Sequence, residues 1–282
     1  LALSGSGEAL GQRAGATLLG AGDGLAALAV DGRVAVASTA DLAKDRWSAE
    51  VGSAAAVPVL ADGSGGLWVW SGDGFAAAAT GQAVGFGQDA GDAGVRYQVL
   101  EGGIVVRVES NAGGEAQSVT RVDPATGQDL WDGAVRHTGP AAVVAADGRI
   151  LTGGFEAVNC VDAETGEQRW SRPADRLIGP DGGNVLVGSA DGRVSALKTS
   201  TGALEYQFDV GAVDFDRADF GLGAEILYLV GPDKLLAHRL EKDAAALWEL
   251  PLPRSSADPP HRLVGAGGEL WLVSGGDLRP IR

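Results

Sequence analysis

Residues 122–131 read Val-Asp-Pro-Ala-Thr-Gly-Gln-Asp-Leu-Trp, and residues 161–170 read Val-Asp-Ala-Glu-Thr-Gly-Glu-Gln-Arg-Trp. The two segments share the valine, the aspartate, the Thr-Gly pair and the tryptophan, and Trp131 and Trp170 lie 39 residues apart. A fixed period of about 40 residues, with short strand-like runs and glycine turns in each unit, is typical of a radial array of small sheets. The repeat therefore predicts an all-β protein with the architecture of a β-propeller.

One copy of the repeat shows the expected strands most clearly. Alternating apolar residues indicate four short strands, at Arg176 to Gly179, Asn184 to Gly188, Arg193 to Lys198 and Ala203 to Val210. The turns between them contain Asp181-Gly182, Asp191-Gly192 and Thr201-Gly202. Such pairs are strong hairpin signals, because the turn requires a positive φ. Each repeat is therefore predicted to be a four-stranded antiparallel sheet.

The same pattern divides the chain into seven units. We expect blades at residues 16–51, 54–90, 95–136, 140–174, 175–211 and 217–252, and a seventh formed by 261–282 together with 1–14. Seven blades require about 40 residues each, which matches the spacing of the tryptophans, whereas eight would require about 35. Pairing of the N- and C-terminal segments would close the ring and remove its open sheet edges. The prediction is one seven-bladed β-propeller domain spanning residues 1–282.

Composition narrows the choice of partner. The chain has 282 residues, 45% of them hydrophobic, and a net charge of −15, which predicts a globular core and an acidic surface. Such a surface disfavours nucleic acid and anionic membranes as partners. The single cysteine, Cys160, excludes an internal disulfide and lies in an apolar run, where we expect a buried packing residue. No stretch reaches the roughly 20 apolar residues of a membrane span.

The N-terminal residues are informative about the cellular location of the protein. Leu1 to Gly7 has neither a basic flank nor an apolar signal core, and the sequence contains no methionine. These features favour a chain from which a signal or an anchor has been trimmed or omitted. We therefore expect an extracytoplasmic, bacterial-type protein: secreted, periplasmic, or the ectodomain of a longer protein tethered to a membrane by a segment outside this sequence.

The motif Asp-x-x-Thr-Gly-x-x-x-Trp resembles the repeat of the pyrroloquinoline-quinone-like (quinoprotein dehydrogenase-like) β-propellers. Its full form stands at Asp123 to Trp131 and at Asp162 to Trp170, and a third copy has Thr201-Gly202 followed by Tyr206. The resemblance implies that the aromatic residue docks one blade on another, since a large ring can bury about 150 to 250 Å². The residues expected in this structural role are Trp47, Trp131, Trp170, Tyr206 and Trp248.

The resemblance does not imply the quinone cofactor for this chain. Quinone-dependent members of the family are larger and hold the quinone beside a disulfide of adjacent cysteines, whereas this sequence contains one cysteine. The chain is more similar to the non-enzymatic propellers of the family, which act as assembly lipoproteins, sensor ectodomains and interaction platforms. We therefore expect no cofactor.

Residues that could carry chemistry are scattered. His137, His238 and His261 fall in three different units, without the spacing of a metal site, and no Gly-x-Ser-x-Gly motif is present. Two acidic segments are candidates for a ligand or partner surface, although each is also typical of a solvated loop. They are Asp214, Asp216 and Asp219 in one segment, and Glu109, Asn111 and Glu115 in the other.

Two functions are compatible with this sequence. The first is a non-catalytic scaffold or sensor that recognises a protein, a peptide or a small ligand through its loop faces or central channel. The alternative is a hydrolase or lyase acting on carbohydrate, with carboxylates gathered at the mouth of the channel. The absence of converging histidine, cysteine and carboxylate motifs favours the scaffold and a protein or peptide partner.

Overall fold

The computed structural model describes most of the chain in short segments. The described residues are 2–3, 9–11, 15–22, 24–51, 59–61, 67–70, 75–82, 94–100, 103–111, 116–123, 127–139, 142–211, 213–215, 218–223, 225–252, 261–266, 269–274 and 277–281. They divide into two compact units, one of residues 1–136 with 163–166 and one of residues 137–162 with 167–282. Whether these units make up one propeller domain stays a prediction.

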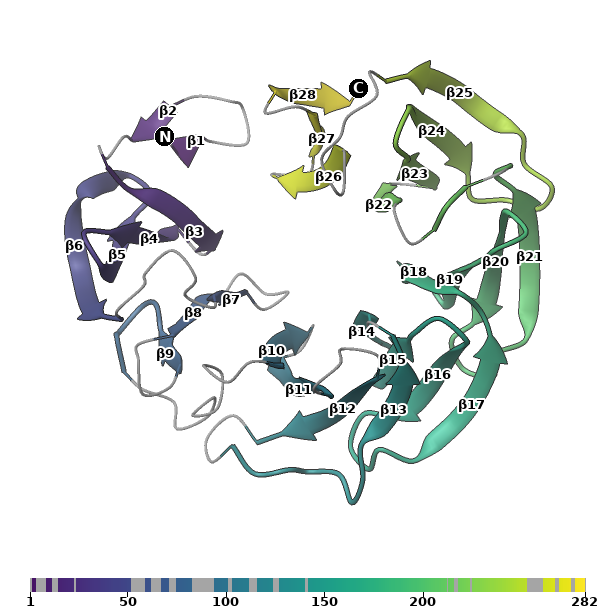
Figure 1. Cartoon of the computed structure of the whole chain (residues 1–282), viewed down its shortest axis with the longest axis horizontal. Helices are drawn as coiled ribbons and strands as arrows, with labels where there is room; N and C mark the ends of the chain where they lie inside the picture. The colour runs from purple at the N-terminus through teal and green to yellow at the C-terminus, as the bar shows by residue number, and fades with distance from the viewer. Residues whose placement is uncertain are drawn as a thin grey trace. The chain divides into compact units, whose positions relative to one another are not determined.

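The secondary-structure elements among the described residues are all β-strands, and they form antiparallel sheets (Figure 1). In the four-stranded sheets the strands lie side by side in chain order. Two of these sheets begin in the first unit: β3 (Thr17–Gly22), β4 (Leu25–Val30), β5 (Arg33–Ser38) and β6 (Asp41–Glu50), and β10 (Val95–Leu100), β11 (Ile104–Ser110), β12 (Ala116–Val122) and β13 (Val135–Thr138).

Three further four-stranded sheets belong to the second unit. They are β14 (Ala142–Ala146), β15 (Arg149–Gly153), β16 (Ala157–Asp162) and β17 (Gln168–Pro173); β18 (Arg176–Asp181), β19 (Asn184–Ser189), β20 (Arg193–Lys198) and β21 (Leu204–Asp209); and β22 (Asp219–Gly223), β23 (Ile226–Val230), β24 (Lys234–Arg239) and β25 (Ala246–Pro251). The second of these confirms the four strands predicted from the clearest repeat, to within two residues at each end.

Smaller sheets lie near the termini and after β6. They are β1 (Ala2–Leu3) with β2 (Ala9–Gly11), then β7 (Val59–Ala61), β8 (Leu67–Trp70) and β9 (Phe75–Ala77), and finally β26 (His261–Ala266), β27 (Glu269–Ser274) and β28 (Asp277–Ile281). The first and last segments therefore form separate sheets among the described strands. The prediction that they pair, and with it the count of seven blades, is not confirmed and stays a prediction.

The core of each unit consists of strand residues that point alternately to the two faces of their sheets. In the first unit, buried residues such as Val34, Val36 and Val69 pack together. In the second unit, Leu186, Leu227 and Leu229 belong to one buried cluster. Cys160 is fully buried in another, and burial raises the pKa of its thiol to about 11. The expectation of a packing role for Cys160 is confirmed.

The fourth strands of several sheets share an irregularity. In β17, Gln168 lies opposite Val161 and Trp170 lies opposite Cys160, so Arg169 is an extra residue on the fourth strand. The same one-residue bulge precedes Trp47 in β6, Tyr206 in β21 and Trp248 in β25. A bulge bends its strand and changes the direction of the neighbouring side chains. It therefore sets the direction of the aromatic residue that follows.

Candidate functional site

Antiparallel topology gives each sheet two ends with different loops. The hairpins between the first and second strands and between the third and fourth lie at one end of a sheet. The link between the second and third strands lies at the other end, with the connection to the next sheet. We call this second end the loop end. For two sheets of the second unit it comprises residues 154–156, 174–175, 190–192 and 210–218, apart from Ala212, Asp216 and Arg217, which lie outside the described residues.

A pocket of about 320 Å³ lies at this loop end. Its lining residues come from four separate loops and combine two carboxylates with two aromatic rings: Phe155, Asp175, Ala190, Val213, Asp214 and Phe215. Sites for small ligands range from roughly 300 to 1,000 Å³. The volume therefore suits one side chain of a partner or a similarly small group better than a large cofactor.

Phe155 forms an exposed wall of the pocket. The residue is 40% exposed. The ring lies directly against Gly139, where even one added carbon would collide with it, and Gly139 has a φ of +75°. The Phe155 N–H also donates to the Thr138 carbonyl at 3.2 Å. The ring is therefore supported on one side by backbone, while a large part of its surface faces solvent.

Phe215 forms the buried wall. It is 4% exposed, and its ring lies over Gly188, so that a side chain at that glycine would collide with it. The ring also stacks on Phe220, with centroids 5.7 Å apart and an interplanar angle of 11°. The guanidinium of Arg176 lies 6.0 Å from the centroid of Phe220. Close packing on both neighbours fixes this wall before any ligand arrives.

Backbone hydrogen bonds position the carboxylate of Asp175 and the main chain of Asp214. Asp175 Oδ2 accepts the N–H of Ala190 at 2.7 Å, while the Asp175 N–H donates to the Gly188 carbonyl at 3.0 Å. The carbonyl of Asp214 accepts the N–H of Ala218 at 3.0 Å, and Asp214 itself is exposed. Asp175 is thus tied to the neighbouring loop, and Asp214 lies on an exposed connection. The pocket is acidic.

The structure separates the acidic residues that the sequence grouped together. Asp214 lines the pocket, whereas Asp219 Oδ2 accepts the N–H of Leu263 at 2.8 Å and Asp219 Oδ1 accepts the N–H of Phe220 at 3.0 Å. Asp219 therefore links β22 to β26 and has a structural position. Asp216 lies outside the described residues. Its part in a partner surface stays a prediction.

The second predicted cluster belongs to the first unit. The guanidinium of Arg107 pairs with Glu109 at 2.6 Å and with Asp129 at 3.0 Å. Burial opposes the charge of Arg107, but the two carboxylates outweigh it and raise the pKa of its side chain. Asn111 Oδ1 accepts the N–H of Ala116 at 3.2 Å across the loop. Glu115 lies outside the described residues, and a partner surface here stays a prediction.

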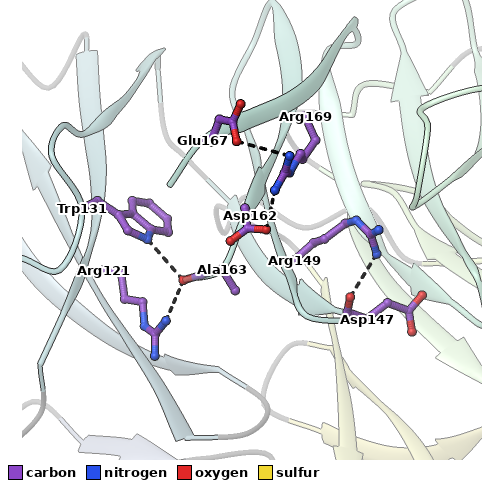
Figure 2. A network of polar contacts seen from close by, with 8 residues as sticks. All are labelled: Arg121, Trp131, Asp147, Arg149, Asp162, Ala163, Glu167 and Arg169. Atoms are coloured by element: carbon purple, nitrogen blue, oxygen red, sulfur yellow. Dashed lines mark hydrogen bonds and ion pairs between the residues drawn. The ribbon is translucent and has the colours of Figure 1, made fainter. Parts of the chain in front are cut away.

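Three tryptophans make the same contact, although the residues around them in the sequence differ. Each indole N–H donates to a backbone carbonyl in a turn that contains a Thr-Gly pair: Trp47 to Ala78 at 2.8 Å, Trp131 to Ala163 at 3.2 Å, and Trp170 to Thr199 at 2.9 Å. Figure 2 shows the indole of Trp131 and the guanidinium of Arg121 directed at the same Ala163 carbonyl. Each ring therefore lies on the Thr-Gly turn of the following repeat, not on the turn of its own.

Tyr206 and Trp248 depart from this arrangement. The Tyr206 hydroxyl donates to Asp181 at 3.2 Å, and burial, together with this carboxylate, raises its pKa to about 12. Trp248 is 38% exposed and tilts against Tyr228, with centroids 6.1 Å apart. It therefore buries far less of its ring than Trp170, which is 7% exposed. The docking role predicted for these aromatics stays a prediction, which mutation can test.

The histidines do not contribute to the pocket. No histidine is among the described lining residues, and all three histidines are buried elsewhere. The ring of His137 hydrogen-bonds Thr152 at 2.7 Å, and the ring of His238 stacks on Phe208; burial lowers the pKa of both imidazoles. In the part of the chain that the structure describes, no group of three or more histidine, cysteine, aspartate or glutamate residues could hold a metal ion.

The sequence alone did not identify Phe155 or Asp175 as site residues. Phe155 follows Gly153 and Gly154, and an aromatic residue inside a glycine turn is a weak signal of an exposed ring. Asp175 carries no local signal, because its importance comes from contact with a loop 15 residues away. Only the tertiary arrangement brings the two side chains to one pocket.

Comparison with known proteins assigns the family. The sequence model described as outer membrane protein assembly factor BamB matches residues 115–275, which is more than half of the chain. The chain belongs to this family. The match confirms the predicted pyrroloquinoline-quinone-like repeat. No curated protein sequence matches the chain. Among the described residues, no helix is long and apolar enough to cross a membrane.

Solved structures similar to this BamB-family chain show its fold. The computationally designed Ika8 protein is 17% identical, with a TM-score of 0.65 over 96% of this chain and 84% of that one. BamB from Moraxella catarrhalis is 14% identical, with a TM-score of 0.54 over 95% and 91%. The C-terminal WD40 domain of Sif2 is 11% identical, with a TM-score of 0.61 over 94% and 80%. These likenesses support the β-propeller fold and assign no function.

Proposed function

We propose that this chain is a non-catalytic scaffold that binds a segment of a partner protein at the loop end of its second unit. The pocket around Phe155 is the observation that carries the proposal. An exposed ring that is held by backbone on one side provides contact area without the entropic cost of ordering a flexible side chain. The family's description as an assembly factor supports a protein partner. Because the same description refers to the outer membrane, the proposal includes an extracytoplasmic location.

Selection from a random peptide library tests this function. A phage-displayed library of 12-residue peptides is panned on the purified chain, and the enriched peptides are then measured against two variants. Phe155→Ala removes the exposed ring of the pocket and should weaken binding by about tenfold or more. Leu204→Ala is the matched control, because Leu204 is another exposed hydrophobic residue of the second unit and does not line the pocket.

The two variants give opposite expectations, so the result is decisive. Loss of binding with Phe155→Ala and retention with Leu204→Ala would support recognition at the loop end. Equal binding by both variants, or no enriched peptide at all, would contradict it. Circular dichroism of both variants shows whether they are folded, and Phe155→Leu repeats the test with a smaller change in packing.

A further inference from the structure

The chemistry of the pocket points to the kind of side chain that it accepts. Two of its six described lining residues are aspartates, two are phenylalanines, and none carries a positive charge. The chain as a whole has a net charge of −15, so an anionic group would approach against the average field. A carboxylate attracts a cation directly, and the face of an aromatic ring attracts it through the ring quadrupole. Acidic and aromatic walls together select a cationic group.

We propose that this pocket binds the guanidinium of an arginine side chain of the partner, an inference that rests on the function proposed above. Arginine fits better than lysine because its guanidinium is flat, stacks on rings and presents a fork of N–H donors. Asp175 uses Oδ2 to accept the Ala190 N–H, and among the described residues Oδ1 has no protein donor. The carboxylate of Asp175 is therefore held in place by the backbone through Oδ2, while Oδ1 can accept a hydrogen bond from the guanidinium.

The second unit already contains one example of the same chemistry. Arg176 places its guanidinium over the ring of Phe220, which stacks on the pocket residue Phe215. The exposed ring of Phe155 offers a similar platform on the solvent side of the pocket. In this arrangement the guanidinium stacks on Phe155 while its N–H groups donate to Asp175.

Three short peptides test the inference. Acetyl-Gly-Arg-Gly-amide, its lysine counterpart and its citrulline counterpart are titrated into the ¹⁵N-labelled chain, and chemical-shift changes are followed by NMR. Citrulline has nearly the shape of arginine and no charge, so we expect its peptide to bind at least about tenfold more weakly. The lysine peptide should fall between the two. Raising the salt from 0.05 to 0.5 M, about a tenfold change in ionic strength, should weaken only the charged peptides.

Two matched substitutions of aspartate by asparagine test whether binding of the arginine peptide depends on the charge of Asp175. Asp175→Asn keeps an oxygen for the Ala190 N–H and removes the charge, so we expect it to weaken the arginine peptide by about tenfold. Asp147→Asn makes the same change in the hairpin between β14 and β15, at the opposite end of its sheet. Asparagine tolerates the φ of +50° found there. This control should leave binding unchanged.

The outcomes distinguish this inference from the function on which it rests. Equal binding of the arginine and citrulline peptides, or unchanged binding by Asp175→Asn, would overturn the arginine site. Library peptides that depend on Phe155 and contain no arginine would do the same while leaving the scaffold function intact. If neither the library nor the arginine peptide binds, both proposals fail.

Discussion

Replacing Trp170 with alanine is expected to lower the free energy of unfolding by about 3 to 5 kcal/mol, the usual cost of removing a large buried aromatic residue. The Trp170 ring is 7% exposed and lies against Gly202, and its indole N–H donates to the Thr199 carbonyl at 2.9 Å. The variant therefore leaves a cavity between two neighbouring sheets and removes the stronger donor from the Thr199 carbonyl, which keeps only its contact with the Cys160 thiol at 3.7 Å. Denaturant unfolding followed by circular dichroism measures the loss.

Trp248→Ala is the internal control for this prediction. Trp248 has the same place after a bulge on the fourth strand of its sheet, but it is 38% exposed and no Thr-Gly pair follows it in the sequence. We expect its replacement to cost on the order of 1 kcal/mol. Equal losses for the two variants would show that contact with the glycine turn adds nothing, and would contradict the docking role of Trp170.

Gly202→Ala should destabilise the same contact from the other side, by about 2 to 4 kcal/mol. Gly202 has a φ of +66°, and an added Cβ would lie 2.7 Å from Cδ2 of Trp170. The carbonyl of Gly202 also accepts the Nε–H of Arg172 at 2.9 Å, so the turn cannot move without disturbing a second contact. The same unfolding measurement applies.

Gly148→Ala separates backbone strain from the steric clash. Gly148 has a φ of +69°, nearly that of Gly202, but a Cβ there would meet no atom within 4 Å. Only the cost of the left-handed conformation remains, which is about 1 to 2 kcal/mol. If Gly202→Ala lowered the free energy of unfolding no more than Gly148→Ala, the Trp170 ring would be able to move away from the added Cβ at little cost. That result would contradict the close packing of Trp170 on Gly202.

The repeat predicted the sheets because its signals are local. Asp181-Gly182 and Thr201-Gly202 occupy turns, and the alternating residues between them form β18 to β21. Gly182 and Gly202 both have positive φ, as their turns require. Hairpins of this kind are determined by residues that lie next to one another in the sequence, so a single copy of the repeat was enough to place the strands.

The partner of each tryptophan could not be predicted in the same way. Trp170 contacts a turn about 30 residues downstream, and the bulge at Arg169 that precedes it leaves no local sequence signal. The difference between Trp170 and Trp248 is likewise a difference in tertiary surroundings, since the residue type and strand position are the same. The repeated position of the tryptophan in the sequence indicated a packing role. Only the fold shows which turn each ring contacts.

The candidate site was predicted only in part, for a related reason. Asp214 belongs to the acidic segment that the sequence singled out, but its neighbour Asp219 bonds to the backbone of β26 instead. The other pocket residues come from loops that are separated in sequence and meet at one end of adjacent sheets. The pocket is present in the structure without a partner, so binding requires little free energy for ordering it.

Hydrogen–deuterium exchange of the whole chain, with and without the tightest library peptide, tests the central claim most directly. We predict slower exchange at residues 153–156, 174–176, 189–191 and 213–215, the loops that surround the pocket, and unchanged exchange in β25. Protection confined to β25, or to the hairpins at the opposite end of these sheets, would contradict recognition at the loop end.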